Sequence, residues 1–290
     1  MKKTVIITDS HSSISQSLAQ KMGIRVLPMP FYIDDKNYLE GIDLSREDFF
    51  RKQASGAKIT TSQPSPQDVM NIWDEALLEY EEILYLPITS GLSGSYETAV
   101  TLAQSEKYAG RVFVVDHGRI STPLHCMILD ALDLISRGIP ASEICDKMEH
   151  ARQNMLIYIA VRTLEYLKKG GRITTAAAAV GSVLNIKPVL KLGSGKLDAF
   201  RKARGMIRAR KLMIETMQND IQKYFREAYD KGELYILAAT SASEKETASW
   251  VKQIEDAFPG HKVMVDYLSL GVSCHTGPDA LGIGCSLKLT

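Results

Sequence analysis

Short apolar runs alternate with longer amphipathic stretches through the first half of the chain. Residues 4–7, 83–88 and 112–115 are continuously apolar or β-branched over the length of a strand, which predicts buried strands. The remaining stretches have helical spacing of their apolar residues, and they are residues 14–22, 67–80, 95–105 and 127–137. This alternation predicts an α/β domain over residues 1–153, with a mostly parallel, doubly wound sheet covered by helices on both faces.

Two segments of this half do not fit the alternation. Residues 26–42 combine an apolar, proline-containing stretch with an acidic turn, and we expect a small hairpin there. Residues 58–66 contain two prolines among several hydroxyl side chains, which predicts a loop. Ser65 and Pro66 at its end are typical of a helix start, so this loop is expected to cap the next helix.

The pattern changes after residue 153. Strands are predicted at residues 156–161, 234–240, 263–268 and 281–289, and a hairpin at 186–192 and 196–202 around Gly193-Ser194-Gly195. An alanine-rich helix is expected at 175–184 and a long amphipathic helix at 205–228. Hairpins with few crossovers predict an α+β domain over residues 154–290, so we expect two domains.

Polar residues follow the predicted strands of the first domain. Thr8-Asp9-Ser10, Thr89-Ser90-Gly91 and Asp116 each stand where a strand ends. Ligands of open α/β sheets bind at the carboxyl ends of the strands, so these residues are expected to lie along a site.

Composition narrows the class of protein. The chain has 290 residues, 45% of them hydrophobic, and a net charge of +1, which gives no overall bias toward nucleic acid. None of the four cysteines forms a C-x-x-C pair, so neither a metal site nor a redox motif is expected. The apolar run near the N-terminus is too short for a signal peptide, and no stretch approaches the roughly 20 apolar residues of a membrane span. We therefore expect a cytoplasmic protein.

The segment Gly91-Leu92-Ser93-Gly94-Ser95-Tyr96 lies between a predicted strand and a predicted helix. Small residues at a helix N-terminus let backbone N–H groups surround a carboxylate or phosphate, although the same residues also suit an ordinary helix cap. The segment nearly matches the G-x-S-x-G motif of serine hydrolases, but Ser95 replaces the second glycine. A stand-alone acyl hydrolase with Ser93 as nucleophile and His275 as base is thus the alternative function.

Further candidates lie in two predicted loops and one basic run. Thr61 and Ser62 offer hydroxyl donors for a carboxylate, although the loop could simply cap a helix. His275 stands among glycine and proline residues in what is predicted to be a loop between strands, where functional residues are common. The basic residues between Arg201 and Lys211 lack interleaved aromatics, so a solvated helix face, an acidic partner or a membrane surface is favoured over nucleic acid.

These segments together resemble the DegV family over essentially the whole chain. The matching elements, in the family's order, are Thr8-Asp9-Ser10, Thr61 to Ser65, Ser90 to Ser95, Lys169 to Arg172, Leu184 to Pro188 and His275 to Pro278. The resemblance implies two domains that enclose one long-chain fatty acid in a tunnel between them. It further implies a protein like the B-type, lipid-carrying subunit of bacterial fatty acid kinase, whose separate ATP-binding subunit phosphorylates the bound carboxylate.

The same resemblance assigns roles to individual residues. It implies that Thr61, Ser62, Ser93, Gly94 and His275 hold the carboxylate, and that Arg172 lies at the surface near the kinase subunit or a transiently contacted membrane. It implies no catalytic residue, no metal and no cofactor besides the bound fatty acid. No phosphate-binding loop of the Walker type is present, which agrees with a separate ATP-binding partner.

Two departures from the family pattern affect the expected tunnel. Ser121 matches a serine in a usually glycine-rich stretch, but Thr122, Pro123 and His125 stand where glycines are usual. Asp279 likewise replaces a common glycine. Bulkier side chains could shorten or reshape the tunnel, so the preferred chain length and saturation are left open.

Overall fold

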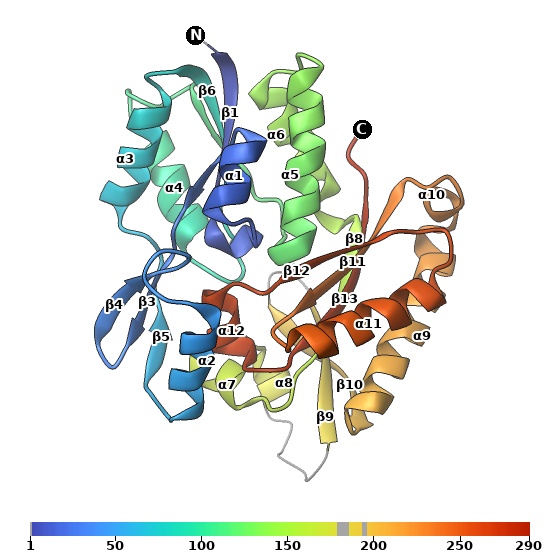
Figure 1. Cartoon of the computed structure of the whole chain (residues 1–290). Coiled ribbons are helices and arrows are strands. Elements are labelled where there is room, and N and C mark those ends of the chain that lie inside the picture. Colours follow the sequence, from blue (N-terminus) through green and yellow to red (C-terminus); the bar gives the residue numbers. More distant parts are fainter. Residues whose placement is uncertain (1, 179–185, 193–195) are drawn as a thin grey trace.

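The computed structural model describes residues 2–178, 186–192 and 196–290, and Figure 1 shows how their helices and strands are arranged. Three sheets organise the chain, with strand orders β2-β1-β6-β7, β4-β3-β5 and β10-β9-β8-β13-β11-β12. This is the mixed α/β architecture that the sequence pattern predicts.

The four-stranded sheet is parallel throughout. Its strands are β1 (Lys2–Asp9), β2 (Arg25–Leu27), β6 (Tyr80–Leu86) and β7 (Val112–Val114). Alternate residues of β1 pack on opposite faces, with Ile6 in one hydrophobic cluster and Val5 and Ile7 in the other. The first face is covered by α1 (Gln16–Met22), α5 (Ser121–Ser136) and α6 (Ala141–His150), and the second by α3 (Pro66–Ala76) and α4 (Ser95–Ala103). The sheet is therefore doubly wound, as predicted.

The hairpin expected at residues 26–42 is present. Strands β3 (Pro30–Ile33) and β4 (Lys36–Leu39) pair antiparallel across Asp34 and Asp35, whose φ angles of 49° and 64° suit a tight hairpin turn. The loop expected at 58–66 is in part a strand, because β5 (Ile59–Thr61) pairs with β3. Helix α2 (Arg46–Ala54) lies between β4 and β5 along the chain. Ser65 caps α3, and Pro66 lies in the first turn of that helix, as predicted.

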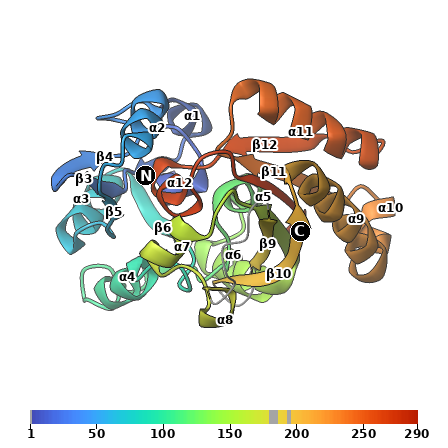
Figure 2. The same cartoon turned by 90° about the horizontal axis from the view of Figure 1, so that it is seen from below.

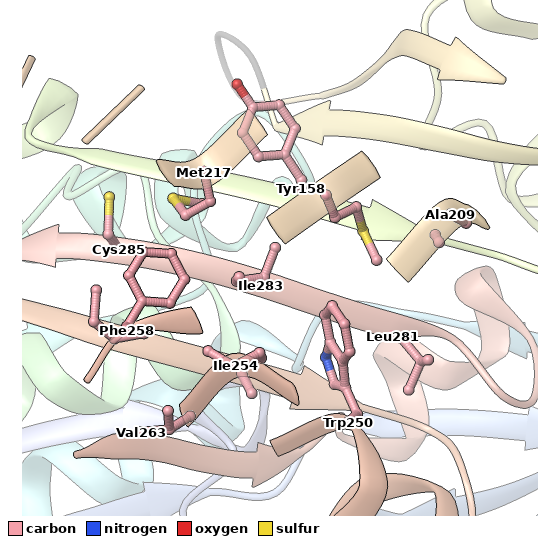
Figure 3. Close-up of a cluster of buried hydrophobic side chains, with 14 of the residues drawn as sticks. Tyr158, Ala209, Met217, Trp250, Ile254, Phe258, Val263, Leu281, Ile283 and Cys285 are labelled. Carbon is pink, nitrogen blue, oxygen red and sulfur yellow. The ribbon is translucent and has the colours of Figure 1, made fainter. Parts of the chain in front are cut away.

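The six-stranded sheet is mixed and begins after residue 154. It comprises β8 (Met155–Ala160), β9 (Ile186–Leu192), β10 (Leu197–Arg204), β11 (Leu234–Thr240), β12 (Val263–Tyr267) and β13 (Leu281–Leu287). Helices α9 (Met206–Tyr224) and α11 (Glu244–Ala257) cover one face, where Met217, Trp250 and Phe258 pack on Tyr158 and Ile283 (Figure 3). The opposite face is turned toward the first half of the chain (Figure 2).

Several predicted boundaries need correction. Helix α5 begins at Ser121 rather than at 127, because Pro123 is tolerated in a first helical turn. His275 lies not in a loop but in a short helix, α12 (Leu270–Thr276), capped by the Ser269 side chain. The remaining short helices are η1 (Ser10–Ser12), η2 (Ala151–Gln153), α7 (Glu165–Gly170), α8 (Thr175–Ala178) and α10 (Arg226–Asp230).

Some expectations fall outside the described residues. They are the second half of the alanine-rich helix, the turn at 193–195 and the start of the Leu184 to Pro188 element. We retain the division into domains 1–153 and 154–290 as a proposal, since each sheet is built from strands on one side of that boundary.

Candidate functional site

A cavity lies between the carboxyl edge of the parallel sheet and the inner face of the six-stranded sheet. Its empty volume, open mouth included, is about 890 Å³. Apolar side chains from both halves of the chain line it, among them Met29, Ile88, Leu92, Ile120, Ile157, Ile159, Leu167, Leu192, Leu197, Leu268 and Val272. The lining of the cavity is therefore mostly apolar, and both halves of the chain contribute to its walls.

The two-residue period of the strands assigns these side chains to the cavity. On β8, Tyr158 and Ala160 pack against α9 and the outer core, whereas Ile157 and Ile159 line the cavity. On β13, Gly282 also lines it, and a Cβ there would lie 3.2 Å from the Ala239 carbonyl oxygen. The inner face of this sheet is therefore aliphatic and locally flat.

Thr61 and His275 form a polar pair in the wall of this cavity. The Thr61 Oγ1 atom lies 2.9 Å from His275 Nε2, at hydrogen-bonding distance. Thr61 ends strand β5 and His275 stands near the end of α12, which packs against β5. On its other side the imidazole lies against Gly170, where a Cβ would fall on Nδ1 and 2.6 Å from Cε1. A missing side chain at Gly170 thus makes room for the ring.

Of the three other predicted head-group residues, two line the same cavity as this pair, whereas Gly94 is not among the lining residues. Ser62 and Ser93 line the same cavity, and the Ser93 hydroxyl is 2.8 Å from that of Ser95. Gly94 is the N-cap of α4, with no side-chain cap, and it lies against Gln63, whose Oε1 would be 2.8 Å from a Cβ there. The hydroxyls can donate hydrogen bonds to an anion, as can the N–H groups at the start of α4, although the Ser95 N–H already donates to Ser93 Oγ at 3.3 Å.

Arg172 stands where the cavity meets an outer cleft. It lines both spaces, as do Thr61 and His275, and the outer cleft has an empty volume of about 1380 Å³. Its side chain is half-buried rather than fully at the surface, and Nε donates to the Leu92 carbonyl at 3.2 Å and Nη1 to the Gly170 carbonyl at 2.5 Å. Lys58 and Lys169 also line the cleft.

The electrostatics of this end favour an anion. Burial, together with the nearby charges of Arg172 and His11, lowers the pKa of His275 to about 4, so its imidazole is neutral at pH 7. A neutral imidazole can donate one hydrogen bond without the desolvation cost of a buried cation. Positive charge at the mouth comes from Arg172, whose guanidinium donates to backbone carbonyls of Leu92 and Gly170.

His11 is a cavity residue that the sequence reasoning missed. It lies in η1, directly after β1, and its side chain is buried. Burial lowers its pKa, but the Asp9 and Glu40 carboxylates outweigh burial and hold the pKa above its ordinary value. The signal was its place after Thr8-Asp9-Ser10, at the carboxyl edge of the sheet.

Glu40 is a second residue that the sequence reasoning missed, and its side chain binds the N-terminus of α12. Its buried carboxylate accepts hydrogen bonds from the Ser10 hydroxyl at 3.0 Å and from the backbone N–H groups of Leu270 and Gly271. Negative charge at a helix N-terminus is stabilising. The Glu40 carboxylate thus fixes the position of the helix that carries His275. No sequence motif predicted this role for Glu40.

The departures from the family pattern are largely turned away from the cavity. The Thr122 hydroxyl donates to the Ala238 carbonyl at 2.8 Å, and His125 Nδ1 lies 3.0 Å from Asp266 Oδ2. Both contacts tie α5 to the six-stranded sheet, and only Pro123 of the three substituted residues lines the cavity. Asp279 has a φ of 58°, a conformation that favours glycine, and pairs with Arg162 at 2.8 Å.

The hydrolase alternative lacks its central contact among the described residues. Ser93 bonds to Ser95, and His275 bonds to Thr61. A serine nucleophile needs a base within hydrogen-bonding reach. Within the described part of the chain there is also no cluster of side chains suited to a metal ion and no helix long and apolar enough to cross a membrane.

Comparison with known proteins gives one consistent family. A family model described as "Uncharacterised protein, DegV family" matches residues 3–288. A DegV domain-containing protein of Staphylococcus aureus is 28% identical over 284 residues, with 98% of each chain covered. One of Caldanaerobacter subterraneus is 29% identical over 287 residues, again with 98% of each covered.

Solved structures share the fold. A DegV family protein from Thermus thermophilus, described for its fatty acid binding, is 32% identical with a TM-score of 0.84, covering 98% of this chain and 99% of its own. A stearic acid-binding protein from Eubacterium ventriosum has a TM-score of 0.87 at 20% identity, covering 100% and 99%. At that identity the second likeness concerns the fold alone.

Proposed function

The chain belongs to the DegV family, and from this premise we propose that it binds a long-chain fatty acid in its cavity and presents the carboxylate to a separate ATP-binding kinase subunit. In this proposal the chain is the lipid-carrying, non-catalytic subunit of a cytoplasmic fatty acid kinase, which visits the membrane surface transiently. The fatty acid is its ligand, and no other cofactor is required.

One observation carries the proposal: an aliphatic cavity ends at the residues it shares with an outer cleft. Thr61, His275 and Arg172 line both spaces. A fatty acid with its chain in the cavity would have its carboxylate at this junction, where hydroxyl, imidazole and guanidinium donors meet. The fatty acid binding ascribed to the Thermus thermophilus relative supports the same ligand class.

The energetics favour enclosure of the chain. Each methylene moved from water into an apolar site gains about 0.8 kcal/mol, and a bilayer offers a similar gain. A protein that takes a fatty acid from a membrane must therefore cover nearly the whole chain. Aliphatic side chains wall the cavity from both sides and support enclosure of this kind, with Ile157 and Ile159 of β8 and Leu192 of β9 on one side and Ile88 and Ile120 on the other.

The outer cleft suits a phosphoryl-transfer partner. A carboxylate at the junction would be reachable from the cleft, which is lined by Arg172, by Lys58 and by Lys169, the last in an ion pair with Glu165 at 2.8 Å. Cations of this kind attract phosphate groups. Since the sequence has no Walker-type loop, the phosphoryl donor is expected to arrive with the partner.

Native purification from a bacterial host, solvent extraction and mass spectrometry test the ligand. We expect one fatty acid per chain. An extract without lipid, together with no uptake of added fatty acids by the purified protein, would reject the proposal. Ile207→Ser, on the exposed face of α9, serves as the handling control, since Ile207 is 84% exposed and far from the cavity lining.

A second experiment separates the carrier from the hydrolase. Loaded protein is incubated with ATP, with and without a fatty acid kinase subunit, and acyl phosphate is trapped with hydroxylamine. The carrier proposal expects product only when the kinase subunit is present. Turnover of acyl esters by the chain alone, abolished in Ser93→Ala, would instead establish the hydrolase.

A further inference from the structure

The N-terminus of α5 faces the cavity without a side-chain cap. The N-cap residue is Ile120, which offers no acceptor, and α5 extends from Ser121 to Ser136. The first N–H groups of a helix have no partner within the helix. Ile120, Ser121 and Pro123 all line the cavity. This helix end therefore presents partial positive charge to an otherwise aliphatic wall.

Ser121 adds an unused hydroxyl at the same place. Its side chain is 3% exposed, and its Oγ has no hydrogen-bond partner among the described residues. A buried hydroxyl without a partner costs about 1–3 kcal/mol. An apolar residue would avoid this cost, so the hydroxyl in the cavity wall suits a polar group of a ligand.

His11 lines the same cavity, but its side chain is already paired. It is 6% exposed, and its Nδ1 lies 3.4 Å from Asp9 Oδ1 in an ion pair. Helix η1, which carries it, packs against α5. Ser121, rather than His11, is therefore the side chain at this helix end whose polar atom has no partner among the described residues.

We propose that the Ser121 hydroxyl and the uncapped N-terminus of α5 form a second polar subsite in the cavity, which takes an oxygen substituent on the acyl chain of the bound lipid. The ligand class is then a hydroxy or oxo fatty acid in place of, or besides, an unsubstituted one. This inference rests on the proposed function, since the subsite would contact the acyl chain of the same fatty acid whose carboxylate is held at the mouth.

The chemistry of the subsite favours a chain oxygen over bare hydrocarbon. An unsubstituted chain would leave the Ser121 hydroxyl and the first N–H groups of α5 unsatisfied or would enclose a water beside them. A hydroxyl or carbonyl oxygen on the chain accepts from these donors and removes that cost. Sites built to hydrogen-bond a ligand oxygen discriminate strongly against the analogue that lacks it.

The test compares stearate with a positional series of hydroxystearates on delipidated protein, by calorimetry or displacement of a fluorescent fatty acid. We expect one position of the hydroxyl to bind about tenfold more tightly than stearate, because one satisfied buried hydrogen bond has that value. Ser121→Ala should remove this preference. Thr61→Val provides the contrast, since a change at the mouth should weaken both ligands equally.

Each outcome has one meaning. Equal affinity of stearate and every hydroxystearate, with stearate bound tightly, overturns the subsite and leaves the proposed function intact; a water would then satisfy Ser121. A preference that survives in Ser121→Ala also overturns it. Failure of every fatty acid to bind rejects the proposed function and the subsite with it.

Discussion

Replacement of Gly170 by alanine adds one methyl group and should test whether His275 helps to hold the carboxylate. Gly170 ends α7, its backbone φ is not in the left-handed region, and alanine normally stabilises a helix by about 0.5–1 kcal/mol relative to glycine. Here the added Cβ would fall on His275 Nδ1 and 2.6 Å from Cε1. The ring must move, and its 2.9 Å contact with Thr61 must then lengthen or break.

The expected magnitude follows from the contacts that are lost. Hydrogen bonds to a charged group contribute about 1.5–3 kcal/mol, so displacement of His275 from a bound carboxylate should raise Kd about ten- to a hundredfold. The measurement is isothermal titration of delipidated Gly170→Ala with a long-chain fatty acid, accompanied by urea unfolding. Loss of affinity without a matching loss of stability is the expected signature.

Gly171 provides the matched control one residue later. It has a φ of 67° and nothing within 4 Å of a Cβ, so alanine there meets strain but no neighbour. Gly171→Ala should cost about 1–2 kcal/mol of stability and leave the affinity within about twofold. If Gly170→Ala binds as tightly as wild type, the imidazole is not held against the carboxylate, and the assigned role of His275 is wrong.

Three further predictions concern other groups. Thr61→Val removes the hydroxyl that meets His275 and should raise the fatty-acid Kd about tenfold in the same titration; an unchanged Kd would exclude Thr61 from the site. Burial lowers the pKa of His117 to about 4, although the hydrogen bond to the Pro87 carbonyl opposes this shift, and Nδ1 of the neutral ring accepts from the Arg119 N–H. As the pH falls, the His117 imidazole of the unfolded chain is protonated before that of the folded chain, so the folded state loses stability. Between pH 7 and pH 4.5, urea titrations should show that wild type loses about 2 kcal/mol more stability than His117→Gln, and equal losses would refute this assignment. Arg172→Gln should slow acyl phosphate formation by the added kinase subunit more than it weakens fatty-acid binding, and the reverse order would move Arg172 from partner contact to ligand holding.

The parts of the fold that follow from local pattern were predictable. The β-branched run at residues 4–7 and the alternating residues of β8 and β13 have buried faces because strand side chains alternate, and this period is visible in sequence. Strand β5 was missed because Pro64 and several hydroxyl residues resemble a loop, while its pairing partner β3 is distant along the chain. Pairing between segments so far apart leaves no local signal.

The candidate site shows the same division. Small and hydroxyl residues in the sequence motifs suggest an anion site, and these motifs contain Ser93, Gly94, Thr61 and His275. The structure brings Thr61 into contact with His275, and Ser93 lines the same cavity. Glu40 could not be found this way. Its role depends on reaching the N-terminus of α12, 230 positions later in the sequence at Leu270, and one acidic residue in a hairpin gives no hint of that contact.

The two ends of the cavity explain how one chain could both hold a lipid and release its head group to chemistry. At the mouth, the donors are an exposed Ser62, a half-buried Arg172 and a neutral His275, so a carboxylate there would keep contact with solvent and with the outer cleft. A buried ion pair at this point would bind the anion more rigidly but would cover the oxygen that must attack a phosphoryl group. Affinity is better supplied by the aliphatic walls, which gain about 0.8 kcal/mol per methylene and leave the head group free. Weak, open contacts at the carboxylate and extensive burial of the chain are therefore what a carrier for a phosphorylation reaction requires.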